Sequence, residues 1–190
     1  EAAFDLVYQR PDLYHIIYPL AEPLLTDPHP AVRLNAAVRL GGIWAIDREH
    51  FWQLIAHVLE NEHNLTVIEH VLNDLVSLLV HSEPARTVAL LLRLLHREPA
   101  GSDRARRVSK AIADKLTVLW VTYQSQEAKV VLDGWLATPW EHPDEVRTIL
   151  TTLRGAIVAG IGDETDKDAD LRQRSQALVS TIVDAVNARL

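Results

Sequence analysis

Apolar residues recur along almost the whole chain at the spacing of one helix face. They fall three or four residues apart, as an α-helix with 3.6 residues per turn requires if one side is to be buried. The clearest stripes are Leu65, Ile68, Leu72, Leu75 and Leu79; Val88, Leu91, Leu92 and Leu95; Val108, Ile112, Leu116, Leu119 and Tyr123; and Val146, Ile149, Leu150 and Leu153. No convincing run alternates apolar and polar residues between hairpin turns. The pattern therefore predicts an all-α fold without β-sheet.

Prolines, glycines and capping residues divide this pattern into helices. Asp27-Pro28-His29-Pro30 must form a turn, because proline lacks an amide donor and disfavours helix in the residue before it. Asp47 and Ser82 have the chemistry of N-caps, and Pro84 and Pro143 suit a first helical turn. The predicted helices cover roughly residues 11–26, 30–45, 47–60, 64–81, 83–98, 103–123, 125–137, 143–159 and 169–189.

These helices form antiparallel pairs at a regular interval. The second helices of successive pairs start near residues 30, 64, 103 and 143, at intervals of 34, 39 and 40 residues. Such intervals are typical of stacked helix-pair repeats, in which neighbouring pairs share a core because one pair cannot bury its own apolar face. We expect residues 1–190 to form one helical repeat domain, with a sub-boundary at 160–168 before the last helix.

About twenty residues, 24–43, resemble the HEAT repeat. The matching positions are Asp27 in the turn, then Val32, Arg33, Ala36, Ala37, Leu40 and Gly41 along the second helix. Asp27 can cap that helix and offer its carboxylate to Arg33 one turn in, while the alanines allow close helix approach. Pro143-Asp144-Glu145-Val146-Arg147 echoes the motif, and elsewhere only the periodicity matches. The resemblance implies a right-handed α-solenoid of about four to five helix pairs, with the second helices on the concave side.

Composition narrows the function classes. The net charge of −7 argues against a dedicated nucleic-acid binder, because phosphate backbones attract basic surfaces. The absence of cysteine removes thiolate zinc sites and cysteine nucleophiles, and it fits a reducing compartment. No apolar run reaches the roughly 18 residues of a membrane span. We expect a cytoplasmic protein that does not enter the membrane.

The chain begins Glu1-Ala2-Ala3 and contains no methionine. We therefore expect it to be a segment of a larger, bacterial intracellular protein. In an alternative interpretation, modified methionines have dropped out of the sequence, which would shift some of the spacings above by one residue.

Nine histidines raise the question of a metal site, and four of them follow a glutamate: Glu49-His50, Glu62-His63, Glu69-His70 and Glu141-His142. HEAT-like deoxyhypusine hydroxylases bind two irons through His-Glu pairs at helix starts. Here the order is reversed and the pairs lie 13, 7 and 72 residues apart, which is no repeat period. We expect surface and helix-end histidines, with no metal and no cofactor.

One dense basic cluster lies at residues 104–110. Arg104, Arg107 and Lys110 share a helix face and are candidates for contact with an acidic partner or with phosphate. HEAT-like DNA glycosylases use such surfaces together with groove aromatics, and this chain offers Trp120, Trp135 and Trp140. The alternative is a solvated charged face, with Trp120 and Trp135 in the core and Trp140 in a turn.

No motif of nucleophilic catalysis or phosphate binding is present in the sequence. The pattern favours a non-enzymatic protein-interaction scaffold or sensor segment, whose partner is another protein or another domain of the parent protein. The expected contact surface follows the second helices near 30–45, 64–81, 103–123 and 143–159. The alternatives are a nucleic-acid-contacting repeat domain and a HEAT-like enzyme such as a DNA glycosylase or a bilin lyase.

Overall fold

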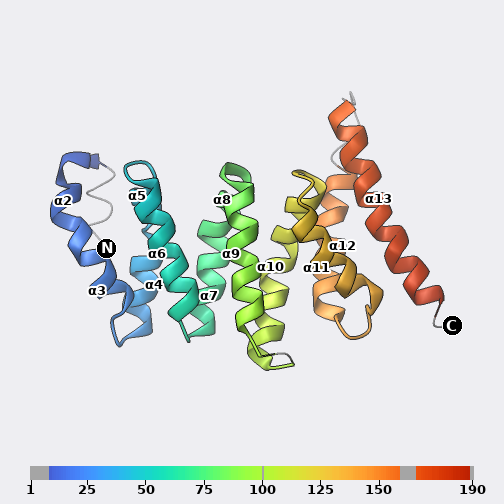
Figure 1. The fold of residues 1–190 in the computed structure, drawn as a ribbon, viewed down its shortest axis with the longest axis horizontal. Helices are drawn as coiled ribbons and strands as arrows, with labels where there is room; N and C mark the ends of the chain where they lie inside the picture. The colour runs from blue at the N-terminus through green and yellow to red at the C-terminus, as the bar shows by residue number, and fades with distance from the viewer. Residues whose placement is uncertain (1–8, 100, 159–165, 189–190) are drawn as a thin grey trace. The chain divides into compact units, whose positions relative to one another are not determined.

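The computed structural model describes residues 9–99, 101–158 and 166–188, with the backbone alone for 155–158 and 166–168, and every regular element in these ranges is helical (Figure 1). The all-α prediction is confirmed. The elements are η1 (Pro11–Leu13), α2 (Tyr14–Ile17), η2 (Tyr18–Leu20), α3 (Ala21–Leu25), α4 (Pro30–Val38), α5 (Gly41–Trp44), α6 (Arg48–Asn61), α7 (Leu65–His70), η3 (Val71–Val76), α8 (Ser77–Ser82), α9 (Pro84–Arg97), α10 (Asp103–Val121), α11 (Gln126–Ala137), α12 (Pro143–Val158) and α13 (Asp166–Asn187).

The second helices begin at the predicted places, but α4 is capped differently. The Nδ1 atom of His29 accepts the N–H of Ala31 at 3.2 Å, so His29 is the N-cap. The carboxylate of Asp27 instead accepts the N–H of His29 at 2.7 Å. The prediction that Asp27 caps this helix is wrong, because its side chain closes the proline-rich turn two residues on.

The other caps follow short-range rules, with one exception. The Asp47 carboxylate accepts the N–H of His50 at 3.0 Å, which confirms the predicted cap of α6. The residue before α9 is Glu83 and not the predicted Ser82, because α8 continues through Ser82. The connection is then the single residue Glu83, whose carbonyl accepts both the N–H and the hydroxyl of Thr87 at 3.0 and 2.9 Å.

Three predicted helices are interrupted. The segment 11–26 alternates short 3₁₀ and α turns, and 64–81 contains a π-helical stretch, η3. Within 30–45, the N–H groups of Arg39 and Leu40 bond three residues back, at 3.2 and 3.1 Å, and this tighter turn separates α4 from α5. The pattern of apolar residues is kept through each interruption, because the backbone still advances by roughly one turn every three to five residues.

The end of α10 adopts an αL cap, with Gln124 as the left-handed residue. The N–H of Ser125 bonds to the carbonyl of Leu119 at 3.1 Å, and the N–H of Gln124 bonds to that of Trp120 at 2.9 Å. Gln124 has φ of 58°, the left-handed conformation that glycine usually takes here. A glutamine therefore stands where the backbone favours glycine.

The chain divides into two compact units. The first comprises Glu1–Leu79 and Arg93–Val108. In it α3 packs against α4 and α6, α4 against α7 and η3, and α5 against α6. Its largest fully buried side chains include Leu40, Ile43, Phe51, Leu54, Ile55, Leu59, Ile68 and Leu72. The buried Ala36 and Ala37 of α4 lie in this core, as small residues at a close helix contact should.

The second unit comprises Val80–Leu92 and Ser109–Leu190. Within it α11, α12 and α13 pack against one another (Figure 1). Its core includes Ile112, Leu116, Leu119, Leu132, Leu136, Ile149 and Leu153. The sub-boundary predicted at 160–168 lies almost entirely outside the described residues.

Candidate functional site

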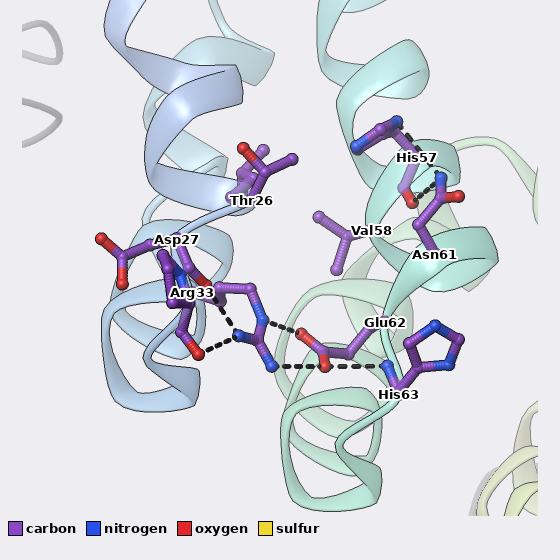
Figure 2. Close-up of a pocket in the computed structure, with 10 residues that line it drawn as sticks. Thr26, Asp27, Arg33, His57, Val58, Asn61, Glu62 and His63 are labelled. Carbon is purple, nitrogen blue, oxygen red and sulfur yellow. Dashed lines mark hydrogen bonds and ion pairs between the residues drawn. The ribbon is translucent and has the colours of Figure 1, made fainter.

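A polar network joins the turns of the first unit, and Glu62 lies at its centre. Glu62 follows α6 directly, and its side chain is only 3% exposed. Arg33 of α4 pairs with it through two parallel bonds, Nε to Oε2 at 2.7 Å and Nη2 to Oε1 at 2.8 Å (Figure 2). The same guanidinium donates from Nη1 to the carbonyls of Asp27 and Pro28, at 2.7 and 3.0 Å. Arg33 therefore ties the turn before α4 to the turn after α6.

The buried carboxylate of Glu62 is compensated from several directions. Besides Arg33, its Oε1 atom accepts the N–H groups of His63 and Asn64 at 2.9 and 2.7 Å. Burial alone would raise the pKa of Glu62, but the bonds from Arg33 and these amides outweigh it and hold that pKa below its usual value. Glu62 is therefore a charged, fully bonded carboxylate at neutral pH.

Arg104 of α10 makes a related set of bonds at the next turn, but its glutamate lies in its own turn and its two carbonyls lie in the neighbouring one. Its Nε atom bonds to both carboxylate oxygens of Glu98, at 2.8 and 2.7 Å, and the Glu98 side chain is 2% exposed. Its Nη2 and Nη1 atoms donate to the carbonyls of Glu62 and His63 at 2.7 and 2.8 Å. One guanidinium again bridges two successive turns through a buried glutamate and two carbonyls.

A pocket of about 280 Å³ opens beside Arg33 and Glu62 (Figure 2). Its walls are formed by Leu25, Thr26, Asp27, Pro28, Arg33, His57, Val58, Asn61, Glu62 and His63. Of its charged groups, Arg33 and Glu62 bond to each other and the Asp27 carboxylate bonds to the N–H of His29, while Asn61 lies 3.2 Å from the Nδ1 atom of His57. Across residues 9–99, 101–158 and 166–188, no three histidine or carboxylate side chains are grouped so as to hold a metal ion. The arrangement is suited to holding turns together.

The residues that were matched to the HEAT repeat differ in burial, and the expected ion pair is not formed. Ala36 and Leu40 are buried, Val32 is half-buried and Gly41 is exposed in α5. Arg33 contacts Asp27 only through the backbone carbonyl, so the predicted contact with the Asp27 carboxylate is wrong. The carboxylate of Glu62, 29 positions along the chain, takes that place because it lies in the adjacent turn.

The basic cluster at 104–110 is largely engaged within the chain. Arg104 is bound as described above, and Arg107 pairs with Glu69 through bonds of 2.9 and 2.8 Å while staying 48% exposed. Arg106 pairs with Asp103. Lys110 is exposed on α10. Arg104 therefore binds the turns, whereas the side chains of Arg106, Arg107 and Lys110 are exposed to solvent.

A second cluster, at the N-terminal end of α6, was not found by sequence reasoning. The Oη atom of Tyr14 lies 2.8 Å from Nδ1 of His50 and 3.2 Å from Oδ2 of Asp47, and the ring of Tyr18 packs against His50 with centroids 4.1 Å apart. His50 was expected as a surface or helix-end histidine, and it lies at a helix start but is buried. Tyr14 and His50 are 36 residues apart in the sequence, so no local pattern could predict this contact.

The pKa shifts of His50 and Tyr14 indicate that this second cluster has a structural role. Burial lowers the pKa of His50, and the nearby Asp47 and Glu22 carboxylates offset only part of that effect. Burial, with the Asp47 charge, raises the pKa of the Tyr14 phenol above its usual value. A phenol with a raised pKa is a poor acid and a poor nucleophile. The cluster fastens the N-terminal segment to α6.

A third feature is a groove on the exposed side of α12. It has a volume of about 560 Å³ and is lined by Pro139, Pro143, Val146, Arg147, Leu150, Thr151 and Arg154. Leu150 was expected in the buried stripe of this helix, but it is 39% exposed. The buried side of α12 is centred on Ile149 and Leu153, so Leu150 falls beyond its edge. Apolar and cationic side chains therefore share one accessible surface.

Two of the tryptophans considered for an aromatic groove, Trp135 and Trp140, differ in how far they are exposed. Trp135 is 7% exposed and belongs to the core, as expected. Trp140 lies in the turn between α11 and α12 and is 44% exposed. Trp120 is half-buried, with the Lys129 ammonium 5.6 Å from its ring centroid.

Comparison of the chain with protein-family models, with curated proteins and with solved structures gave no match. No helix among the described residues is long and apolar enough to span a bilayer.

Proposed function

We propose that this chain is part of a right-handed, HEAT-like α-solenoid of about four to five helix pairs that binds another protein along its second helices. The observation that carries the proposal is the repeated role of Arg33 and Arg104. Each arises from the first turns of a second helix, and each bridges two successive turns through a buried glutamate and a pair of carbonyls. Arg33 and Arg104 lie 71 positions apart, about two repeat intervals, and together they join three successive turns, which supports stacked helix pairs.

The proposed role is a scaffold or sensor segment, and the partner is another protein or another domain of the parent protein. Stacked helix pairs present extended surfaces and need no catalytic constellation. The second helices place polar side chains such as Thr66, His70 and Lys110 in solvent. The exposed side of α12 adds apolar area to that set.

Affinity capture with matched surface variants tests this proposal. The tagged chain is incubated with lysate of the source organism, with and without nuclease, and bound proteins are identified by mass spectrometry. Thr66→Arg with Lys110→Glu alters second helices, whereas Gln53→Arg with Arg86→Glu alters exposed positions of first helices by the same net charge. A protein partner should still be captured after nuclease treatment. It should be captured by the first-helix variant but not by the second-helix variant.

Two outcomes would overturn the proposal. Capture that depends on intact nucleic acid would favour a nucleic-acid-contacting repeat domain. Equal loss of the partner with both variants, both still folded by circular dichroism, would show that the second helices are not the specific contact surface.

A further inference from the structure

The groove on α12 is lined by apolar side chains together with two arginines. Val146 and Leu150 lie one turn apart, and Pro139 and Pro143 extend this apolar surface at the N-terminal end of the helix. Leu150 is 39% exposed, although an aliphatic side chain of this size is usually buried. The groove therefore offers an accessible seat for one aliphatic side chain.

Arg147 and Arg154 lie on either side of the exposed Leu150 along the helix, three positions before it and four after it. Arg147 and Arg154 are separated by seven positions, or about 10 Å along the axis at 1.5 Å per residue. The Arg147 side chain is 78% exposed, and its Nη1 atom lies 3.6 Å from Oδ1 of Asp144, too far for a strong hydrogen bond. A side chain so exposed keeps most of its hydrogen-bonding capacity for another carboxylate.

We propose that this groove binds an acidic protein segment that inserts one aliphatic side chain against Val146 and Leu150, with carboxylates on either side contacting Arg147 and Arg154. This inference rests on the proposed protein-binding function and names the chemistry of the partner. An extended segment advances about 3.3 Å per residue, so acidic residues three positions apart span the two arginines. The apolar insertion gives affinity, and the paired charges fix the direction and register of the segment.

An acidic protein segment fits the groove better than a nucleic acid does. Nucleic-acid bases bind mainly by stacking on aromatic or guanidinium planes, whereas the apolar lining here is aliphatic and proline-rich. The net charge of −7 also opposes a long polyanion, while a short segment with few carboxylates is affected less.

A phage-displayed library of random twelve-residue peptides provides the test. It is selected on the full chain at low salt, and the most enriched peptide is labelled with fluorescein for anisotropy titration. Enriched peptides should contain one leucine, isoleucine or valine flanked by aspartate or glutamate. The measured Kd should rise roughly tenfold with Arg147→Gln plus Arg154→Gln, since two exposed charge pairs are lost, and it should rise with added salt.

Matched variants make the result specific. Arg93→Gln plus Arg106→Gln removes two arginines that are 61% and 66% exposed but lie outside the groove, and it should leave the Kd within about twofold. Leu150→Gln keeps both charges and should weaken binding at least fivefold, because it removes the exposed aliphatic contact.

Several results would overturn the inference. The first is a selection that enriches no peptide, or one that enriches basic peptides. The second is equal weakening of peptide binding by the two double-arginine variants. The third is that Arg147 and Arg154 are needed for binding of a labelled twenty-nucleotide single-stranded DNA but not for binding of the peptide. If lysate capture retains a nuclease-resistant partner equally well with Arg147→Gln plus Arg154→Gln, the proposed function stands and this inference falls. If no protein is captured by the unmodified chain, the proposed function itself fails.

Discussion

Removing the Arg33 guanidinium should destabilise the first unit much more than removing an exposed one. In Arg33→Met the methylene stem is largely kept, but Glu62 loses both bonds from the guanidinium. The carbonyls of Asp27 and Pro28 lose their bonds to Nη1 as well. The substitution therefore leaves a carboxylate that is 3% exposed without its counter-charge.

The expected cost follows from what remains around Glu62. Removing one partner of a buried ion pair lowers the free energy of unfolding by about 3–5 kcal/mol when nothing else compensates the remaining charge. Here the amides of His63 and Asn64 still bond to the carboxylate, and the adjoining pocket of about 280 Å³ has room for water. We expect a loss of about 2–3 kcal/mol in the free energy of unfolding.

Urea unfolding at pH 7, followed by far-UV circular dichroism, measures this loss. With a slope of about 2 kcal/mol per molar urea, the midpoint should fall by about 1 M. Arg93→Met is the matched control, because Arg93 is 61% exposed and its pair with Glu60 is 3.3 Å long. That control should cost no more than about 0.5 kcal/mol.

A double variant separates pairing from the loss of a large side chain. Glu62→Gln added to Arg33→Met removes the unpaired buried charge, so the two losses should not add, and the coupling between them should reach about 1–2 kcal/mol. Equal midpoints for Arg33→Met and Arg93→Met, or strict additivity in the double variant, would refute the assignment of Arg33 and Glu62 as the central pair of the turn network.

Three further outcomes follow from the same structure. Arg104→Met should cost about 2–3 kcal/mol in urea unfolding, because Glu98 is 2% exposed and loses its counter-charge; a cost below 0.5 kcal/mol would contradict this. The lowered pKa of His50 means that its stabilising contribution is complete above its unfolded pKa, near 6.5, and is lost as the pH falls through the lower folded value. The melting temperature should therefore drop between pH 7 and pH 5, and His50→Gln should flatten that drop; an unchanged profile would argue against it. Gln124→Gly should raise the stability by about 0.5–1 kcal/mol in the same urea assay by relieving the left-handed backbone of a non-glycine residue, whereas Gln124→Ala should not.

The sequence by itself determined the helices, because their signals are short-range. Pro30, Asp47, Pro84 and Pro143 act on the backbone within one turn of themselves, so the starts of α4, α6, α9 and α12 could be predicted to within about a residue. Helical periodicity likewise predicted most buried positions, since a face repeats every 3.6 residues whatever it packs against.

The tertiary structure alone decided which side chains meet. Arg33 finds Glu62 across 29 positions, Tyr14 finds His50 across 36 and Arg104 finds the Glu62 carbonyl across 42, and no local rule encodes such pairings. The motif placed an arginine correctly but assigned it to the wrong carboxylate, because the nearer Asp27 side chain was already bonded to the turn. The exposure of Leu150 also depended on packing, since periodicity gives the spacing of a face and the neighbouring helices set its width.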